Sequence, residues 1–469
     1  MNRIILIGNG FDLAHGLKTS YANFIDWYWN EWGKRLVNSL NYIEEDGLCE
    51  FSLIYNVERS WSGIVWNCKS EGCLPALQPF DGRVLVNYIK SHPQMCTFSY
   101  KSHLLEELCK QLEERNWVDV ENVFYELLRS GKEQPKKLND DLDIIKGKLI
   151  EYLKIVQDDI KNGLVNEDLK KKMFEPVCFN DVALSSIEQW MKLIQLHLSY
   201  SSQDWDLMRE DYSIDEKDPD YMKLKKFINV KKRNKVASDS LDTIFQKVTD
   251  FLPKLSFEYN NPGDVKKKLE KSKRYKAPAL FFLPDRVLLL NFNYLSTADM
   301  YFPAKNNRFK INHIHGILSS PKSVIFGYGD ELDENYKRLS EKNDNEYLRN
   351  IKSIKYLEAT NYRSLLEFIE SDAYQIYIMG HSCGNSDRTL LNTLFEHKNC
   401  VSIKPFYFIR KDGTDNYMEL VQNISRNFTD MKLMRDRVVN KTFCEPYSDA
   451  REKISYCADT PEGAKLPLP

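Results

Sequence analysis

The sequence lacks any hydrophobic run long enough to span a membrane. Its longest apolar runs centre on Val287–Leu290 and Ile376–Met379, far short of the about 20 residues that a membrane helix needs. The start of the chain also lacks the pattern of a signal peptide, because Met1 leads directly into a strand-like run and then into charged loops. We therefore expect a cytoplasmic protein without membrane contacts.

Neither sign of charge is in large excess. The 66 Lys and Arg residues nearly balance 68 Asp and Glu residues, which gives a formal charge of −2. This balance argues against a protein whose main task is to bind nucleic acid. Two local basic stretches stand out, Val230–Lys235 and Lys266–Lys276. Such runs are usually solvated helix faces, and a polyanion-binding face is the alternative.

The ten cysteines form no recognisable framework. Cys68 and Cys73 are a close pair, but no second pair follows at the spacing of a zinc finger. In a reducing compartment we expect free, mostly buried thiols. The sequence thus predicts no metal site.

The first stretch of the chain resembles a nucleotide-binding turn but lacks the last glycine of that motif. Ile4–Ile7 is a continuous aliphatic run, typical of a strand buried inside a parallel sheet. It ends at Gly8-Asn9-Gly10, where missing side chains let backbone N–H groups approach a phosphate. A full dinucleotide motif has a third glycine, but Leu13 stands there. A phosphate-binding turn and an ordinary tight turn are therefore both open.

Further strands are expected only after a long helical region. A helix should begin near Tyr21 with Ser20 as its N-cap, and helical periodicity extends over most of 138–255. Strand-like runs follow at 285–294, 310–316, 323–327, 374–382 and 402–410.

This order of strands and helices predicts an α/β fold, with a Rossmann-like doubly wound parallel sheet and a large all-helical insertion. The expected domains are a discontinuous α/β domain (1–40 and 280–440), a helical insertion (41–279) and a loosely structured tail (441–469).

Two carboxylates, Asp119 and Glu121, fall near the start of a helical segment at 117–128. The favoured interpretation is that they complement the positive end of that helix. The alternative is that they face a ligand pocket.

Four of the expected strands end in glycines or hydrogen-bonding side chains. These ends are Gly8–Asp12, Asn291–Asn293, His313–Gly316 and Gly380–Asp387. Ligands of open α/β sheets bind beyond the carboxyl ends of the strands. Four such ends are hard to explain by packing, and they predict a binding site along one rim of the sheet.

Single residues at this rim suggest roles. His315 could take up a proton near pH 7, and His313 would share its face and support it if the strand is regular. The Asn293 amide could hold a ribose or a water, or it could tie down its loop. Asp387 precedes a helix and is expected to be its N-cap.

A serine hydrolase is a further reading of the last strand end. Gly380, Ser382 and Gly384 match the spacing of a nucleophile elbow. In that fold the catalytic histidine follows the serine, and after Ser382 only His397 is available, inside the next helix. This position is awkward for a base, so the hydrolase ranks last.

Several of these motifs together resemble the AbiH family of bacteriophage abortive-infection proteins. The resemblance rests on the segment 7–21, Ile-Gly-Asn-Gly-Phe-Asp-Leu-Ala-His-Gly-Leu-Lys-Thr-Ser-Tyr, and on shorter motifs at 117–121, 292–294, 313–316, 378–382 and 386–387. It implies defence against phage by shutdown of the infected cell, and a phage-derived trigger as a partner.

The order of the motifs also resembles that of sirtuin-like NAD-binding domains, which implies NAD as ligand and substrate. By position, Gly8 and Gly10 match the phosphate turn, Asn293 matches the residue at the nicotinamide ribose, and His315 matches the catalytic base. In some bacterial defence proteins such domains hydrolyse NAD.

The late Gly-x-Ser at Gly380 and Ser382 matches the motif that holds the adenosine half of NAD in those domains. Asn9 departs from the small residue usual between the two glycines. The paired zinc cysteines of deacetylases are absent, which disfavours deacetylation.

The sequence hypothesis is therefore an abortive-infection protein that hydrolyses or binds NAD, with no metal. Its catalytic residues are His315 and Asn293, and its ligand-binding residues are Gly8, Asn9, Gly10, Asp12, His313, Gly380, His381 and Ser382. A non-catalytic nucleotide-sensing module and a nuclease-like toxin that uses the basic stretches are the alternatives. A homo-oligomer is among the assemblies that the sequence allows.

Overall fold

The computed structural model describes residues 1–447, apart from 55–59, 71–80, 116–118, 161–164, 187–188, 190–191, 194–195, 198, 234–281, 303–305, 307 and 411. The predicted helical stretch 234–255, the basic stretch 266–276 and most of the predicted tail lie outside these residues. Among the described residues, no helix combines the length and the apolar character needed to cross a membrane.

The centre of the fold is a five-stranded sheet in which every pairing is parallel. Its strands lie in the order β6-β5-β1-β7-β8, and their bounds are Asn2–Ile7 (β1), Val287–Asn291 (β5), Phe309–His313 (β6), Tyr374–Met379 (β7) and Cys400–Phe406 (β8). The prediction that the first strand joins the sheet of the late strands is confirmed. All residues of β1 are buried, as a central parallel strand requires.

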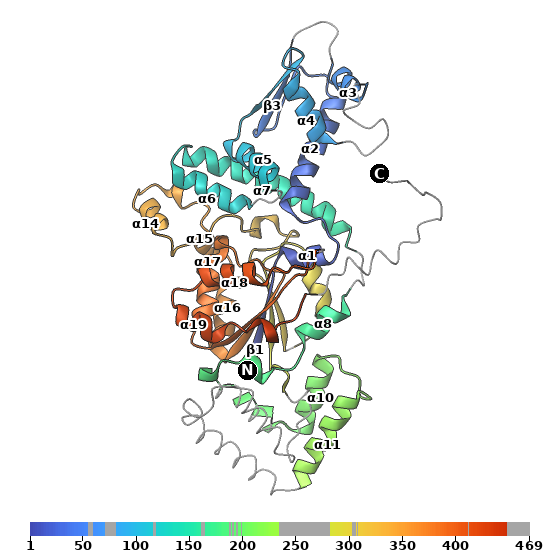
Figure 1. The fold of residues 1–469 in the computed structure, drawn as a ribbon, viewed down its shortest axis with the longest axis vertical. Coiled ribbons are helices and arrows are strands. Elements are labelled where there is room, and N and C mark those ends of the chain that lie inside the picture. The colour runs from blue at the N-terminus through green and yellow to red at the C-terminus, as the bar shows by residue number, and fades with distance from the viewer. Residues whose placement is uncertain are drawn as a thin grey trace, which may run out of the picture.

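Helices cover both faces of this sheet (Figure 1). Ile4 and Leu6 face a core with α16 (Asn361–Ser371), α17 (Arg388–Glu396) and α18 (Tyr417–Arg426). Ile5 and Ile7 face the other core, to which α1 (Asn9–Ala14), α8 (Glu167–Met173), α10 (Ser202–Asp211) and α11 (Pro219–Arg233) contribute. Successive strand residues point to opposite faces, so the aliphatic run of β1 serves both cores.

The segment between β1 and α8 forms a second packing unit, drawn above the sheet in Figure 1. Its helices are α2 (Tyr21–Asn38), α3 (Trp61–Ser70), α4 (Gly82–Ser91), α5 (His103–Arg115), α6 (Val120–Ser130) and α7 (Pro135–Asp158). The Ser20 hydroxyl accepts a hydrogen bond from the Asn23 N–H, which confirms the predicted N-cap of α2.

The prediction that this insertion is all-helical is wrong. Three short antiparallel strands form a sheet in the order β2-β3-β4, with bounds Ile43–Glu45, Cys49–Leu53 and Cys96–Tyr100. Their side chains alternate between the core and the surface, which is the period of a strand with one buried face. The signal is short and lies in a region rich in aromatic residues, so it was missed.

The predicted strand at 323–327 is also wrong. Val324, Ile325 and Phe326 are buried, but their backbone joins no sheet. The Val324 carbonyl accepts a hydrogen bond from Lys146 Nζ, and the Ile325 carbonyl accepts one from the Tyr294 hydroxyl. Side chains thus satisfy the carbonyls that a ladder would use. The remaining helices of this half are α14 (Glu334–Ser340), α15 (Lys352–Lys355) and α19 (Met431–Arg437).

Candidate functional site

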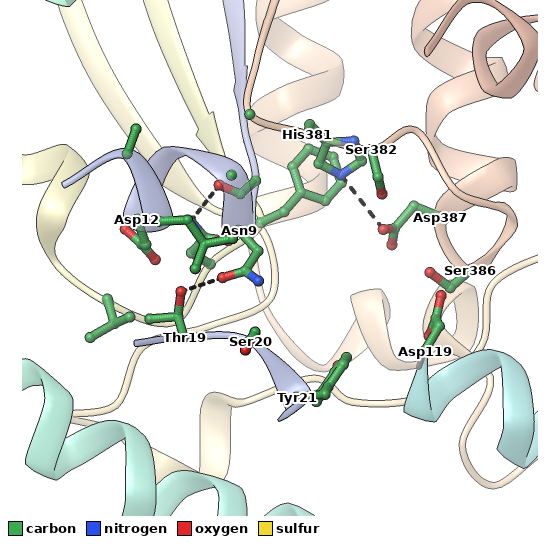
Figure 2. A pocket seen from close by; sticks show the side chains of 18 of the residues that line it. Asn9, Asp12, Thr19, Ser20, Tyr21, Asp119, His381, Ser382, Ser386 and Asp387 are labelled. Atoms are coloured by element: carbon green, nitrogen blue, oxygen red, sulfur yellow. Dashed lines mark hydrogen bonds and ion pairs between the residues drawn. The ribbon is translucent and has the colours of Figure 1, made fainter. Parts of the chain in front are cut away.

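A cavity of about 700 Å³ lies at the carboxyl ends of the central strands. Figure 2 shows it between the turns after β1 and β7 and the starts of α2 and α6. All but one of the predicted site residues line it: Gly8, Asn9, Gly10, Asp12, Asn293, His315, Gly380, His381 and Ser382. The structure therefore brings together the strand ends at Gly8 and Gly380, which are far apart in the chain.

The glycines after β1 and β7 allow these two turns to touch. A Cβ on Gly8 would lie 2.5 Å from the Cα of His381, and a Cβ on Gly380 would lie 2.2 Å from the backbone N of Phe11. Gly380 also has a φ of +76°, which glycine adopts without strain. We expected the Gly10 N–H to bind a phosphate, but it already donates to the Gly380 carbonyl at 2.8 Å. That amide is therefore not a phosphate ligand.

The close approach of these turns predicts that Gly8→Ala is destabilising. Its methyl group has no room beside the His381 backbone, so we expect the free energy of unfolding to fall by at least about 1–3 kcal/mol, as for an overpacked core. Urea denaturation measures this loss. Gly147→Ala in α7 is the control, because a Cβ there meets nothing within 4 Å and should stabilise the helix by up to about 1 kcal/mol. Equal stability of Gly8→Ala and the unsubstituted protein would contradict the geometry.

Asn293 and Asn9 hold the loops at the mouth of the site. The Asn293 side-chain amide donates to the Gly8 carbonyl at 2.9 Å, and its backbone N–H donates to the Asn291 side chain. The Thr19 hydroxyl donates to Asn9 Oδ1 at 2.5 Å. Asn293 thus ties down its loop, the alternative role considered from the sequence, and its side-chain oxygen and second amide N–H are left for a ligand.

Asp12 is a buried carboxylic acid in the cavity wall. It is 1% exposed, and burial raises its pKa to about 7, although the side chain of Thr297 lowers it. Its Oδ2 atom has no hydrogen-bond partner among the described residues. A buried polar atom without a partner costs free energy, so this oxygen can accept a hydrogen bond from a ligand.

His315 lies at the inner wall of the cavity with oxygen atoms on both sides of its ring. Nδ1 is 3.2 Å from the Phe292 carbonyl, and Nε2 is 3.2 Å from both the Tyr356 hydroxyl and Asp387 Oδ1. Burial lowers the pKa of His315, and Lys352 adds to this effect against the opposing charge of Asp387. The ring is therefore neutral at pH 7, and a proton taken up at Nε2 would lie beside the Asp387 carboxylate.

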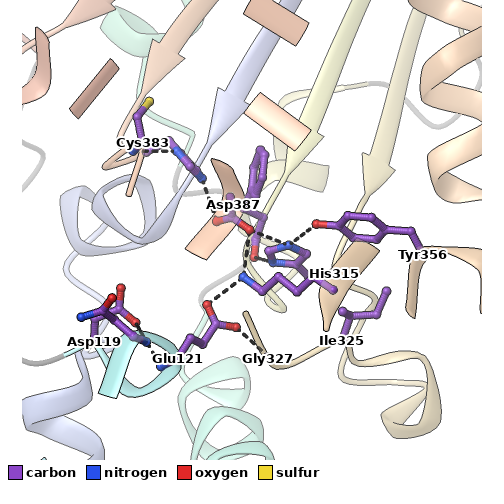
Figure 3. Close-up of polar contacts among 12 residues, drawn as sticks. Asp119, Glu121, His315, Ile325, Gly327, Tyr356, Cys383 and Asp387 are labelled. Carbon is purple, nitrogen blue, oxygen red and sulfur yellow. Dashed lines mark hydrogen bonds and ion pairs between the residues drawn. The ribbon is translucent and has the colours of Figure 1, made fainter. Parts of the chain in front are cut away.

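Asp387 and Lys352 connect this histidine to the insertion, and Figure 3 shows His315, Asp387 and Glu121 close together. Lys352 Nζ lies 2.8 Å from Asp387 Oδ1 and 2.7 Å from Glu121 Oε2. Glu121 Oε1 accepts a hydrogen bond from the Gly327 N–H at 3.1 Å. Lys352 is 1% exposed, so this ion pair joins α6, α15 and the residue before α17 in a buried place.

The charges of this cluster shift one another's pKa values. Burial raises the pKa of Asp387, but Lys352 and His315 outweigh it and hold the value well below its usual range. Burial raises the pKa of Glu121 to about 7, in spite of the opposing effect of Lys352. Burial lowers the pKa of Lys352, but the two carboxylates outweigh it and raise the value. Among the described residues, no group of three or more His, Cys, Asp or Glu side chains is placed to hold a metal ion.

The two acidic residues near the start of α6 have different roles. Asp119 is the N-cap of α6, because its side chain accepts hydrogen bonds from the N–H groups of Glu121 and Asn122. Glu121 faces Lys352. Both residues also line the cavity, so the favoured helix-end role of Asp119 and the alternative pocket role are both present.

The prediction that Asp387 is the N-cap of the following helix is confirmed in its position. Asp387 occupies the N-cap position of α17, but its carboxylate makes no capping hydrogen bond. The carboxylate instead contacts Lys352 and His315. Attraction between full charges in a buried place outweighs the weaker interaction with a helix end.

His313 is the one predicted ligand-binding residue that does not line this cavity. It is the last residue of β6, and its Nε2 lies 3.0 Å from Asp299 Oδ1. We expected His313 and His315 to share a face, but the strand ends at His313 and the chain turns at Gly316, whose φ is +84°. The alternation of a strand therefore does not extend to His315.

The described contacts of Ser382 do not form a hydrolase triad. Its hydroxyl makes no hydrogen bond to His315 or His381 among the described residues. His381 Nδ1 instead accepts a hydrogen bond from the Cys383 N–H at 3.0 Å. The residue with a left-handed backbone is Cys383, with a φ of +54°, one position after the serine of the proposed elbow.

Sequence reasoning missed Lys352 and Tyr356. Both lie in a charged helical stretch without a motif, and a buried lysine there looks like any solvated one. The one available signal was charge: Asp119, Glu121 and Asp387 were all expected near strand or helix ends, and carboxylates that converge in a core need a cation.

One of the three comparisons with known proteins gave a match. The family described as "Bacteriophage abortive infection AbiH" matches residues 4–409, a range that contains β5 to β8, all but the first two residues of β1, and most of the cavity lining. Neither curated proteins nor solved structures gave a match. Since the family match covers most of the chain, the protein belongs to the AbiH family of bacteriophage abortive-infection proteins.

Proposed function

We propose that this AbiH protein acts in phage defence by binding NAD in the cavity and hydrolysing it. The strand order supports a nucleotide ligand. Numbered by position in the chain, the strands β6-β5-β1-β7-β8 read 3-2-1-4-5, which is the order of Rossmann dinucleotide-binding sheets. In such sheets the ligand binds where the order reverses, here between β1 and β7, and the turns of these two strands form one wall of the cavity.

The size of the cavity also suits such a ligand. A volume of about 700 Å³ lies within the range of about 300–1,000 Å³ typical of small-molecule sites. Because the Gly10 N–H is already bonded to Gly380, the phosphates must find other donors. One candidate in the lining is the Asn416 side chain, whose Oδ1 atom accepts a hydrogen bond from the Phe408 N–H and whose own N–H groups donate to no described residue.

The observation that carries a hydrolytic role is the placement of His315. His315 is a neutral imidazole in the cavity wall, a group that can take up a proton near pH 7, and Asp387 Oδ1, 3.2 Å from its Nε2 atom, would stabilise the protonated ring. In the proposed step, water attacks C1′ of the nicotinamide ribose, the bond to nicotinamide breaks, and the bonding electrons neutralise the departing ring. His315 takes the proton of the water, and the products are nicotinamide and ADP-ribose.

Release of nicotinamide tests the proposal directly. Purified protein is incubated with NAD, with and without lysate of phage-infected cells, and free nicotinamide is quantified by chromatography. We expect release that is abolished in His315→Asn, and cells that carry this variant should lose protection in a plaque assay. Absence of nicotinamide under both conditions, from protein that protects cells, would overturn the hydrolytic role.

A nucleotide-sensing module without catalysis is the second candidate, and one observation favours it. His315 is only 4% exposed, and both ring nitrogens already contact protein atoms. If calorimetry detects NAD binding while no nicotinamide is released, this second function replaces the first. The nuclease reading rests partly on the basic stretch 266–276, which lies outside the described residues.

A further inference from the structure

One end of the cavity carries negative charge without a matching cation. Asp119, Glu121 and Asp387 line it, and the permanently charged partner of the last two is a single lysine, Lys352. Among the described residues, no Lys or Arg side chain lines the cavity. When both of its carboxylates are ionised, Lys352 therefore leaves one negative charge unbalanced.

The carboxylates at this end repel one another. Besides burial, the charge of Asp387 raises the pKa values of both Asp119 and Glu121. The hydrogen bonds of Asp119 to the start of α6 offset only part of its own charge. A buried charge without a partner is costly for a folded protein. A proton on Glu121 relieves this excess, because burial raises the pKa of that side chain to about 7, and a cationic ligand at the cavity wall would relieve it in the same way.

Two further observations in the same cavity point to a ligand of this kind. The Oδ2 atom of Asp12, in a side chain that is 1% exposed, lacks a hydrogen-bond partner among the described residues. In addition, the lining near the carboxylates includes the aromatic rings of Tyr21, Phe292 and Tyr294. Aromatic faces attract cations within about 6 Å, and flat rings stack on them.

We propose that the end of the cavity formed by Asp119, Glu121 and Asp387 is a subsite for a flat organic cation. The identity of the cation rests on the proposed function. Under that function, the cation is the positively charged nicotinamide ring of NAD. Stacking on the aromatic walls favours a flat ring over a metal ion, and the carboxylates favour the oxidised, charged ring over its neutral reduced form.

The subsite would also stabilise the positive charge while the bond between nicotinamide and ribose breaks. The nicotinamide ring starts with the positive charge and leaves neutral, while the ribose becomes oxocarbenium-like. One positive charge is thus present throughout the step and moves only by about the length of a bond. Carboxylates fixed beforehand by Lys352 and by the start of α6 stabilise such a charge without rearranging.

The test compares two small ligands with the same ring. 1-Methylnicotinamide carries the positive charge and nicotinamide is neutral, and neither contains phosphate. Calorimetric titration of the full chain should show the cation binding at least about 10-fold tighter, a difference of about 1.4 kcal/mol. NAD should likewise bind tighter than NADH. Equal affinities for the two small ligands, or no binding of either, would overturn the subsite.

Variants test which carboxylates produce the preference for the cation over neutral nicotinamide. Glu121→Gln and Asp119→Asn each remove one charge with little change of shape, and asparagine is as good an N-cap as aspartate. Both should reduce the preference for the cation several-fold. Glu44→Gln is the matched control, because Glu44 is a buried, Arg35-paired glutamate in the insertion that does not line the cavity. Thermal melting shows which variants fold, and a preference that survives in folded Glu121→Gln and Asp119→Asn would contradict the assignment.

The same titrations separate this subsite from the proposed function. If 1-methylnicotinamide is preferred but NAD neither binds nor is cleaved, the subsite stands and the NAD hypothesis fails. If NAD is cleaved but the two small ligands bind equally, the NAD hypothesis stands and the subsite fails.

The affinity for the cation should depend on pH. Glu121, whose pKa burial raises to about 7, faces Lys352 and Asp387, with Asp119 and Tyr21 nearby. The carboxylate must be ionised to balance a cation, so 1-methylnicotinamide should bind more tightly as the pH rises through about 7 and should displace a proton. Nicotinamide should show no such trend, and a flat profile for the cation would contradict the role of Glu121.

Discussion

Replacing Lys352 with methionine should lower the free energy of unfolding by about 3–5 kcal/mol, the usual cost of removing one partner from a buried ion pair. Methionine fills similar space, so the loss comes mainly from charge. Glu121 and Asp387 would then face each other in a buried place without the lysine that contacts both at 2.7–2.8 Å. Urea denaturation at neutral pH measures the change.

The chain offers both a control and a rescue for this substitution. Lys322 is an exposed lysine of the same half, and Lys322→Met should change stability by no more than about 0.5 kcal/mol. Adding Glu121→Gln to Lys352→Met removes one of the two uncompensated charges and should restore part of the loss. If Lys352→Met is as stable as the control, the ion pair does not hold α6, α15 and the start of α17 together.

The pH dependence of this variant has a defined sign. In the intact protein, Lys352 and His315 outweigh burial and keep the pKa of Asp387 well below its usual range. These interactions therefore add stability at neutral pH, which is lost as the pH falls through the folded-state pKa of Asp387. Without Lys352 the pKa values of both carboxylates rise above their unfolded values. The variant should then regain stability, relative to the intact protein, between about pH 8 and about pH 5.

His315→Asn should lower the rate of nicotinamide release by about 10²–10⁴-fold, the usual contribution of a general base. Asparagine keeps a polar group near the Phe292 carbonyl but cannot take up a proton. Because His315 contacts the inner wall and does not hold the turns of β1 and β7 together, NAD affinity should change little. Steady-state kinetics should show a lower kcat, and calorimetry should show an unchanged Kd for NAD.

His313 provides a control for His315 that could not be chosen from the sequence alone. It lies two residues away and pairs with Asp299 outside the cavity lining, so His313→Asn should retain activity. An inactive His313→Asn beside an active His315→Asn would show that the two histidines have been assigned in the wrong order.

The sheet was predictable from sequence because its strands carry a strong local signal. Runs such as Ile4–Ile7 and Ile376–Met379 are too short for helices and too apolar for loops, and parallel order then places their ends on one rim. The sheet of the insertion was missed because its short strands alternate only weakly between apolar and polar residues, whereas β5 is equally short but begins with four successive aliphatic residues. The buried segment Val324–Phe326 was mistaken for a strand. Its apolar sequence predicts burial but does not reveal which groups form hydrogen bonds with its backbone.

The site was predictable only where its residues follow strands. His315, His381 and Ser382 line the cavity as the rim argument suggested. Lys352 was not foreseeable, because its partners Glu121 and Asp387 are 231 and 35 residues away in the chain, and no local pattern records such a contact. The role of Gly10 was misjudged for a related reason: a Gly-x-Gly turn can serve close packing between two turns as well as a phosphate, and only the position of Gly380 distinguishes the two.

The central place of β1 has a consequence for synthesis. β1 is translated first, but its partners are β5 at 287–291 and β7 at 374–379. At about 5–20 residues per second, the first strand must wait roughly a quarter of a minute to a minute for β5, and longer for β7. No growing chain can therefore contain the cavity before its late strands have left the ribosome. A protein with the proposed activity would thus become competent only after its late strands have been translated.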